Sequence, residues 1–179
     1  MSTQALNGHT VRRLLAVTEP QAQGLADLLI DCVADGASVS FMHPLPPAKA
    51  LNFWHRVAEA VARGERALLV AEDARGGVVG TVQLILDQPE NQPHRADLSK
   101  MLVHPQARRR GLGAALLRAA EHLARDCGKS LLVLDTASSD AERLYAKLGW
   151  QRCGVIPGYA LLPRGGLCDT TYFYRSLHS

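Results

Sequence analysis

The stretch HPQARRRGLGAALL, residues 104–117, places three adjacent arginines, Arg108, Arg109 and Arg110, directly before Gly111 and Gly113. Three neighbouring positive charges repel one another, and glycine weakens the start of whatever helix follows. A negative group that approaches the backbone closely would offset both effects. The stretch therefore indicates an anion site, and the candidate anions are a nucleic-acid backbone, a membrane surface and the phosphates of a small cofactor.

Outside this stretch the charges of the chain balance. The 179 residues carry 20 basic and 17 acidic side chains, for a formal net charge of +3. Without the three arginines, 17 basic residues remain to balance the 17 acidic ones. A nucleic-acid surface would spread basic residues over one whole face. We therefore expect a local anion site and no nucleic-acid partner.

The sequence lacks the signals of secretion, membrane insertion and metal binding. Residues 1–13 contain no apolar signal segment, and no stretch reaches the roughly 18 apolar residues of a membrane-spanning helix. The four cysteines show no CxxC spacing and the seven histidines no HExxH spacing, so we expect no metal. These features predict a cytoplasmic protein with reduced thiols and no membrane partner. Its length fits a single domain over residues 1–179, of which residues 1–10 are expected to be flexible.

Hydrophobic periodicity on both sides of the stretch predicts an α/β fold. A helix over residues 111–127 has one apolar face, made of Leu112, Ala115, Leu116, Ala119 and Leu123. Residues 130–136 form a nearly continuous apolar run, typical of a strand buried on both faces. The other expected elements are a strand at 11–17, a helix from the Thr18 N-cap to Gly36, a helix at 47–62, a hairpin of strands at 66–73 and 77–86, a strand at 94–104, a helix at 139–149, and strands near 150–154 and 170–176. The order β-α-α-β-β-β-α-β-α-β-β describes one mixed sheet flanked by helices.

A strand, a glycine turn and a helix in this order bring a helix N-terminus to an anion. Free backbone N–H groups and the helix dipole favour negative charge there, and Gly111 and Gly113 would let phosphates approach without a Cβ in the way. Two known phosphate motifs are excluded: no Lys-Ser or Lys-Thr follows the glycines, and Leu116 stands where GxGxxG needs its third glycine. The remaining pattern, R-x-x-G-x-G, predicts a phosphate cradle. The alternative is a solvated basic helix start.

Three motifs together resemble one protein family. They are KMLV (100–103), PQARRRGLGA (105–114) and AERLYAKLGW (141–150), and they resemble the GNAT superfamily of acyl-CoA-dependent acetyltransferases. The tabtoxin-resistance branch of this family is similar in further stretches: DGASVSFM (35–42), VAED (70–73), LLVLDT (131–136) and IPGYALLPRGGLCDTTYFYRSL (156–177). The resemblance implies a mostly antiparallel sheet, acetyl-CoA as cofactor, coenzyme A as product, and no metal.

By this resemblance, two segments hold the cofactor. The main chain of Met101, Leu102 and Val103 lies along the pantetheine arm, and the Arg108 side chain stands where the family often has Gln or Arg. Six main-chain amides hold the pyrophosphate, those of Arg109, Arg110, Gly111, Leu112, Gly113 and Ala114. Ser138 departs from the family pattern, which often has Asn seven residues before its acid tyrosine.

Acetyl transfer needs an acid for the departing thiolate and a base for the acceptor. Tyr145 occupies the family's general-acid position, where a phenol near pKa ~10 would protonate the departing thiolate, whose thiol has a pKa near ~8.5; the alternative is a tyrosine that only packs. Asp135 ends an apolar run, where a partly buried carboxylate would serve as the base. A carboxylate that braces the next helix, a base acting through water, and no dedicated base remain open alternatives. A main-chain N–H at Leu102 or Val103 is the candidate oxyanion donor.

Two loops rich in Gly, Pro and Ser are expected to form the acceptor pocket. Their candidate contact residues are Asp35, Ser38, Phe41, Met42, Tyr159 and Asp169, with packing as the alternative for Phe41 and Met42. We predict an enzyme that moves an acetyl group from acetyl-CoA to an amine or hydroxyl by direct attack in a ternary complex. The acceptor is expected to be small, polar and amino-acid-like or β-lactam-like, as in toxin or antibiotic resistance. The alternative function is a non-catalytic acyl-CoA-binding sensor, and the oligomeric state stays open, with a homodimer among the states that the family suggests.

Overall fold

A mixed sheet forms the centre of the molecule. The computed structural model describes residues 4–6 and 8–177, and within them eight strands pair in the order β1-β2-β3-β4-β5-β6-β8-β7. All neighbouring strands are antiparallel except β5 and β6, which are parallel. The strands are β1 (Gln4–Leu6), β2 (His9–Leu14), β3 (Arg66–Glu72), β4 (Val78–Ile85), β5 (Arg95–Val103), β6 (Leu131–Thr136), β7 (Gln151–Leu161) and β8 (Leu167–Ser176).

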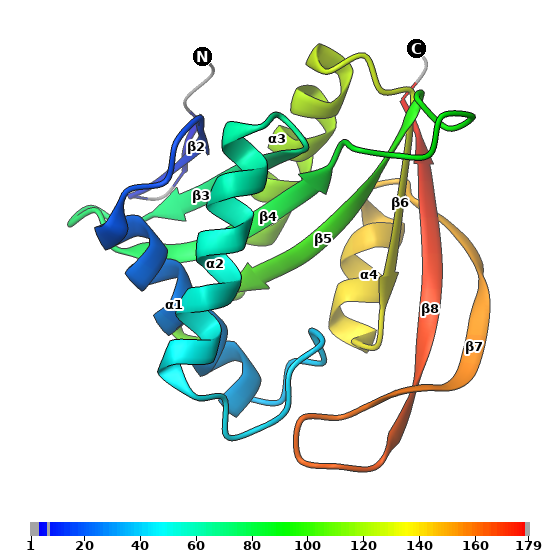
Figure 1. Ribbon diagram of the computed structural model, residues 1–179. Coiled ribbons are helices and arrows are strands. Elements are labelled where there is room, and N and C mark those ends of the chain that lie inside the picture. The colour runs from blue at the N-terminus through cyan, green and yellow to red at the C-terminus, as the bar shows by residue number, and fades with distance from the viewer. Residues whose placement is uncertain (1–3, 7, 178–179) are drawn as a thin grey trace.

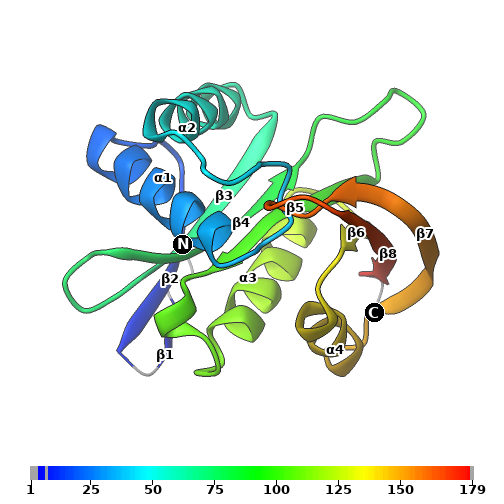
Figure 2. The same ribbon diagram turned by 90° about the horizontal axis from the view of Figure 1, so that it is seen from below.

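Helices cover both faces of this sheet (Figure 1). They are α1 (Glu19–Ala34), α2 (Pro47–Ala62), the short 3₁₀ helix η1 (Pro105–Ala107), α3 (Leu112–Asp126) and α4 (Ser139–Lys147). Figure 2 shows α1 and α2 on one side of the sheet and α3 and α4 on the other. The predicted fold class, a mostly antiparallel mixed sheet flanked by helices, is confirmed. No helix within the described residues is both long enough and apolar enough to cross a membrane.

Each face of the sheet has its own apolar core. Trp54 and Leu68 are fully buried between the sheet and the pair α1 and α2. Leu116 and Leu132 are fully buried on the face that α3 covers. Each such side chain stabilises the fold by roughly 1.5–3 kcal/mol. The two cores hold β5 and β6 in place at the centre of the sheet.

β5 and β6 separate after a short paired segment. Residues 95–97 of β5 pair with residues 131–133 of β6, and no further pair joins the two strands within the described chain. Residues 98–103 and 134–136 therefore diverge, as Figure 1 shows. The main-chain groups on this side of residues 98–103 therefore form no hydrogen bonds with β6. An open strand edge of this kind presents main-chain N–H and C=O groups to a ligand.

Most expected elements form, with different boundaries at the two ends of the chain. The strand expected at residues 11–17 is β2, which ends at Leu14, because the chain leaves the sheet at Leu15, which is 54% exposed. The hairpin at the C-terminus is longer than expected, since β7 continues to Leu161. The pairing of β7 with β8 shifts between Ile156 and Ala160, and such an irregularity accommodates Pro157 in a strand.

The strand at 131–136 is buried on one face only. Leu132 and Leu134 are buried, whereas Val133 is half-buried and Asp135 is exposed. The expectation of burial on both faces is wrong, because α1 and α2 cover β2 to β5 and do not extend over β6 (Figure 2). The uncovered face of β6 becomes part of the site described below.

Part of the expected flexible segment belongs to the sheet. Residues 4–6 form β1, and His9 and Thr10 begin β2, where Thr10 pairs with Glu72 of β3. Strand pairing restrains the backbone of these residues, and the flexibility of the segment stays a prediction. Gly8 lies between β1 and β2. Residues 1–3 and 7 of the expected segment lie outside the described residues.

Candidate active site

A cleft of about 1680 Å³ opens between the diverging ends of β5 and β6. Its other walls are the N-terminal turns of α3 and α4, the loop after α1, and the β7–β8 hairpin. All but one of the residues that the sequence singles out line this cleft, namely Asp35, Ser38, Phe41, Met42, Met101, Leu102, Val103, Arg108, Arg109, Gly111, Leu112, Gly113, Ala114, Asp135, Ser138, Tyr145, Tyr159 and Asp169. The exception is Arg110, which does not line the cleft.

The glycine turn ends in a helix N-terminus at the cleft. Gly111 is the N-cap of α3 and has φ +82°, a left-handed conformation that favours glycine. The first helical hydrogen bond runs from the N–H of Ala115 to the carbonyl of Gly111, 3.1 Å away. The N–H groups of residues 112–114 therefore have no partner inside the helix. Together with the helix dipole they favour a negative group, such as a phosphate, at this end of the cleft.

Gly113 has a packing role that the sequence did not indicate. A Cβ at this position would lie 3.1 Å from Cδ2 of Leu144 and 3.4 Å from Cε of Met101. The missing Cβ therefore lets α3 pack closely against side chains of α4 and β5. For Gly113, the expectation that the missing Cβ makes room for phosphates is wrong, because apolar side chains occupy that space.

The Arg108 side chain ties the end of β5 to α1. Its Nε donates to the carbonyl of Val103 at 3.1 Å, and its Nη1 donates to Oδ2 of Asp35 at 2.5 Å. The buried Cys32 thiol donates to the same carbonyl at 3.7 Å, and burial raises the pKa of this thiol to about 11. Asp35, expected in the acceptor pocket, is thus engaged by Arg108. These contacts fix the position of Val103, the last residue of the open edge.

Tyr145 belongs both to the core and to the cleft. Only 4% of the residue is exposed, and the ring centroids of Trp150 and Phe173 lie 5.8 and 5.7 Å from its own. Trp150 is held in turn by a buried hydrogen bond, which its Nε1 donates to Oε1 of Glu121 at 2.9 Å. Burial, and then the negative charge of Asp135, raises the pKa of the Tyr145 phenol. The hydroxyl therefore keeps its proton at neutral and moderately alkaline pH, as a proton donor requires.

Asp135 stands near the end of β6 with its carboxylate exposed to the cleft. Its Oδ2 accepts a hydrogen bond from Oγ1 of Thr170 at 2.7 Å. The expectation of a partly buried carboxylate is wrong, because β6 is uncovered on this face. Asp135 does not cap the next helix, since Ser138 is the N-cap of α4 and its Oγ accepts from the N–H of Ala141 at 3.3 Å. The alternative that Asp135 braces this helix stays a prediction.

The two loops expected to bind the acceptor meet beside the cleft. The N–H of His43 donates to the carbonyl of Pro163 at 2.8 Å. Nη2 of Arg164 donates to the carbonyl of Ala34 at 3.1 Å. Segments more than a hundred residues apart in the chain thereby form one wall.

The candidate acceptor residues on these loops have different roles. Phe41 packs edge-on against Phe53, with ring centroids 5.3 Å apart, as its packing alternative predicts. Asp169 accepts a hydrogen bond from the N–H of Gly158 at 2.9 Å and so stabilises the β7–β8 hairpin. Three candidates keep a polar or flexible group at the cleft: Ser38, with Oγ 3.7 Å from Sγ of Cys168; Met42; and Tyr159, with its hydroxyl 3.2 Å from that of Tyr172.

Sequence reasoning missed several cationic side chains of the cleft. Arg118 of α3, Arg143 and Lys147 of α4, and Lys100 of β5 all line it. The three helical residues follow the pattern of a solvated helix face, and Lys100 stands at an irregularity of β5 that no periodicity predicts. These cations suit an anionic ligand. Within the described part of the chain, no three His, Cys, Asp or Glu side chains are close enough together to bind a metal ion.

The sequence matches the profile of the acetyltransferase (GNAT) family over residues 21–150. The chain belongs to this family. The matched segment begins within α1 and ends just after α4, so it includes the glycine turn, the open edge of β5 and Tyr145. The family resemblance seen in the three sequence motifs is thereby confirmed.

Solved structures of other proteins share the fold. The protein yncA from Salmonella typhimurium, solved with its cofactor acetyl-CoA, is 23% identical with a TM-score of 0.77, over 97% of this chain and 96% of that one. A ribosomal-protein-alanine N-acetyltransferase from Brucella melitensis is 24% identical with a TM-score of 0.78, over 93% and 98% of the two chains. A phosphinothricin acetyltransferase from Sinorhizobium meliloti, in complex with acetyl-CoA, is 20% identical with a TM-score of 0.78, over 94% and 88%. At these identities the likeness establishes a common fold.

Proposed function

We propose that this protein transfers an acetyl group from acetyl-CoA to an amine or hydroxyl of a small polar acceptor. One observation carries the proposal: a single cleft joins the N-terminus of α3, the open edge of β5 and the phenol of Tyr145. Acetyl-CoA has three matching parts, an anionic pyrophosphate, a pantetheine arm with two amides, and a thioester. The Salmonella and Sinorhizobium proteins, which share the fold, bind acetyl-CoA.

The residues of the cleft fit these three parts. The N–H groups of residues 112–114 would hold the pyrophosphate, and the main chain of residues 101–103 would pair with the amides of the arm as a neighbouring strand does. Arg118 and Arg143 add positive charge beside the helix N-termini. The Ser138 hydroxyl oxygen already accepts a hydrogen bond from α4, and its hydrogen would be the group that contacts the pantetheine arm.

Two side chains at the other end of the cleft would move protons. Acetyl-CoA supplies an acetyl group activated as a thioester. Tyr145 donates a proton to the departing sulfur. Burial raises the pKa of its phenol, so the hydroxyl is protonated before the transfer. Asp135, held by Thr170, accepts the proton of the acceptor amine directly or through a water. Both side chains line one cleft, which favours direct attack in a ternary complex.

The acceptor is proposed to be amino-acid-like, and the enzyme to act in toxin or antibiotic resistance. The similarity of residues 156–177 to the tabtoxin-resistance branch supports this class. The shared fold with a phosphinothricin acetyltransferase is consistent with it. We place the enzyme in the cytoplasm, because its four cysteines are free thiols, as in a reducing compartment.

Acetyl-CoA turnover with a panel of acceptors tests the proposal. Purified protein is mixed with acetyl-CoA and amines, amino acids, amino sugars or β-lactam amines, and the release of free thiol is recorded. We expect at least one amine to accelerate thiol release above the rate without acceptor, and mass spectrometry to find that amine acetylated. A protein that binds coenzyme A in a calorimeter but acetylates none of these compounds would instead be the non-catalytic sensor.

A further inference from the structure

β5 contains a bulge at the edge of the cleft. Between the pairs Thr81–Leu102 and Gln83–Ser99, two residues of β5 stand opposite one residue of β4. One of the two is Lys100, whose φ of +50° is a left-handed conformation that residues with a Cβ rarely adopt. Bulges redirect side chains and occur often beside active sites. The backbone therefore determines where the Lys100 side chain points.

Lys100 is a cation without a carboxylate partner. Its Nζ donates to Oγ of Ser40 at 3.2 Å and lies 5.8 Å from the ring centroid of Phe53, and no carboxylate of the described residues is within ion-pair distance of it. The side chain is half-buried, and burial followed by the charge of Arg66 lowers its pKa, while Asp135 has the opposite effect. A partly desolvated charge without a counter-ion is unfavourable. An anionic ligand in the cleft would offset this penalty.

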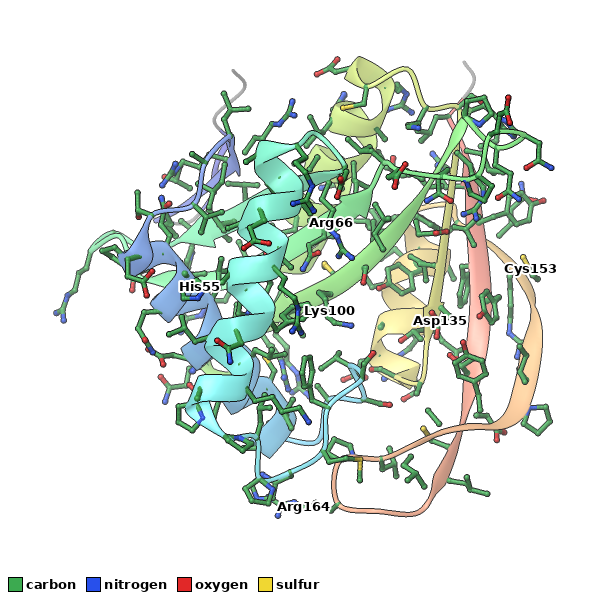
Figure 3. The ribbon with its side chains drawn as sticks, in the orientation of Figure 1. His55, Arg66, Lys100, Asp135, Cys153 and Arg164 are labelled. Carbon is green, nitrogen blue, oxygen red and sulfur yellow. The ribbon has the colours of Figure 1, made fainter. Side chains whose placement is uncertain are left out.

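The opposite wall of the cleft is negative and rich in hydroxyls. Asp135 of β6 is exposed there and accepts its hydrogen bond from Thr170. Its cross-strand partner is Tyr172, whose hydroxyl lies 3.2 Å from that of Tyr159. In Figure 3, Lys100 lies on the side of α2 and Asp135 on the side of β8. A ligand that spans the cleft therefore meets a positive group at one end and a negative group at the other.

We propose that Lys100 binds a carboxylate of the acceptor while the acceptor amine lies at Asp135. The acceptor is then a zwitterion, an amino acid or close analogue with a free carboxylate. The inference rests on the proposed function, because it concerns the acceptor end of the same cleft. If Lys100 instead accepted the proton of the amine, its removal would lower kcat for every acceptor. A carboxylate anchor changes KM, and only for acceptors that carry a carboxylate.

The test compares acceptors that differ only in the carboxylate. Each common L-amino acid, its primary amide and its decarboxylated amine are offered with acetyl-CoA, and thiol release is measured. We expect kcat/KM for the preferred amino acid to exceed that for its amide by about tenfold or more. The amide lacks the charged hydrogen bond to Lys100, and the loss of such a bond has an effect of this size. In Lys100→Gln the preference should fall below about threefold through a higher KM, with kcat nearly unchanged. Lys100→Arg should keep part of the preference, because its charge remains.

Lys49→Gln is the matched control. The exposed Lys49 places its Nζ 6.0 Å from the ring centroid of Phe41 and does not line the cleft. This variant should keep the full preference for amino acids. A wild-type enzyme that uses amides as well as acids overturns the inference. So does a Lys100→Gln variant that loses kcat equally for acids and amides.

A second readout separates this inference from the proposed function. Protein saturated with coenzyme A is melted in the presence of an amino acid or its amide, and Tm is recorded. Amino acids that bind should raise Tm of the wild type and not of Lys100→Gln. A shift that depends on Lys100, without thiol release from any acceptor, contradicts acetyl transfer and leaves the carboxylate site standing. No shift in the wild type, or an equal shift in both proteins, overturns the carboxylate site.

Discussion

The variant Tyr145→Phe separates proton donation from packing. The ring is 4% exposed against Trp150 and Phe173, and its hydroxyl forms no hydrogen bond with another described residue. Phenylalanine keeps the ring contacts and leaves no partner unsatisfied. We therefore expect the free energy of unfolding at pH 7 to change by less than about 1 kcal/mol. Tyr145→Ala would empty the ring site and lower the free energy of unfolding by about 3–5 kcal/mol.

The rate of Tyr145→Phe should fall although its stability does not. Removal of a general acid lowers kcat by about 10²–10³-fold at neutral pH, or about 2.7–4.1 kcal/mol of transition-state stabilisation. Affinity for coenzyme A should stay within about twofold, because the hydroxyl acts on the departing sulfur. The loss should shrink as pH rises past ~8.5, where a thiol increasingly leaves without a proton.

Thiol release is measured between pH 6 and pH 9.5, from about two and a half units below a thiol pKa to about one unit above it. Calorimetry gives the affinity for coenzyme A, and urea unfolding gives the stability. Tyr174→Phe is the matched control, because its hydroxyl donates to Gln151 and the residue does not line the cleft. The control should keep the wild-type kcat. If folded Tyr145→Phe retains kcat within about threefold of the wild type at pH 7, Tyr145 is a packing residue and the acid assignment is wrong.

The remaining predictions concern two pKa shifts and the glycine turn. Folded Tyr145 keeps its proton above about pH 10, where unfolded tyrosine ionises. In urea titrations the difference in unfolding free energy between the wild type and Tyr145→Phe should therefore be constant below this pH, and above it the wild type should lose stability relative to the variant by at most about 1.4 kcal/mol per pH unit. Burial raises the pKa of Cys32 to about 11, so peptide mass spectrometry should find iodoacetamide on the exposed Cys153 and not on Cys32 until the protein unfolds. Gly111→Ala and Gly128→Ala each place a Cβ in left-handed backbone (φ +82° and +72°) and should each lower stability by about 1–2 kcal/mol. Calorimetry should find coenzyme A binding weakened only in Gly111→Ala, by about tenfold or more, and equal affinity in the two variants would exclude the turn from the site.

Local patterns in the sequence were sufficient to predict the elements around the glycine turn. Three features predict these elements: the apolar face of the helix after Gly111, the glycine at its N-cap, and the strand before it. All three are patterns of residues close together in the sequence. The helix that carries Tyr145 has a polar cap and a glycine stop in the same way. These signals also predicted the helix N-terminus at the cleft, because helix geometry leaves its first N–H groups without partners.

Contacts between distant residues were beyond local patterns. The Arg108–Asp35 pair joins residues 73 positions apart, and it engages a carboxylate that the sequence suggested only as an acceptor contact. The bulge at Lys100 depends on the register of β4 against β5, which periodicity does not determine. The exposure of Asp135 follows from where α1 and α2 end on the sheet, a property of packing rather than of the strand itself.

A crystal structure of the protein grown with coenzyme A tests most directly whether the cleft between β5 and β6 is the cofactor site. We predict electron density for the pyrophosphate at the N–H groups of residues 112–114, for the arm along residues 101–103, and for the sulfur beside the hydroxyl of Tyr145. Ordered coenzyme A bound elsewhere, with the cleft empty or the sulfur turned away from Tyr145 and Asp135, would contradict acetyl transfer in this cleft.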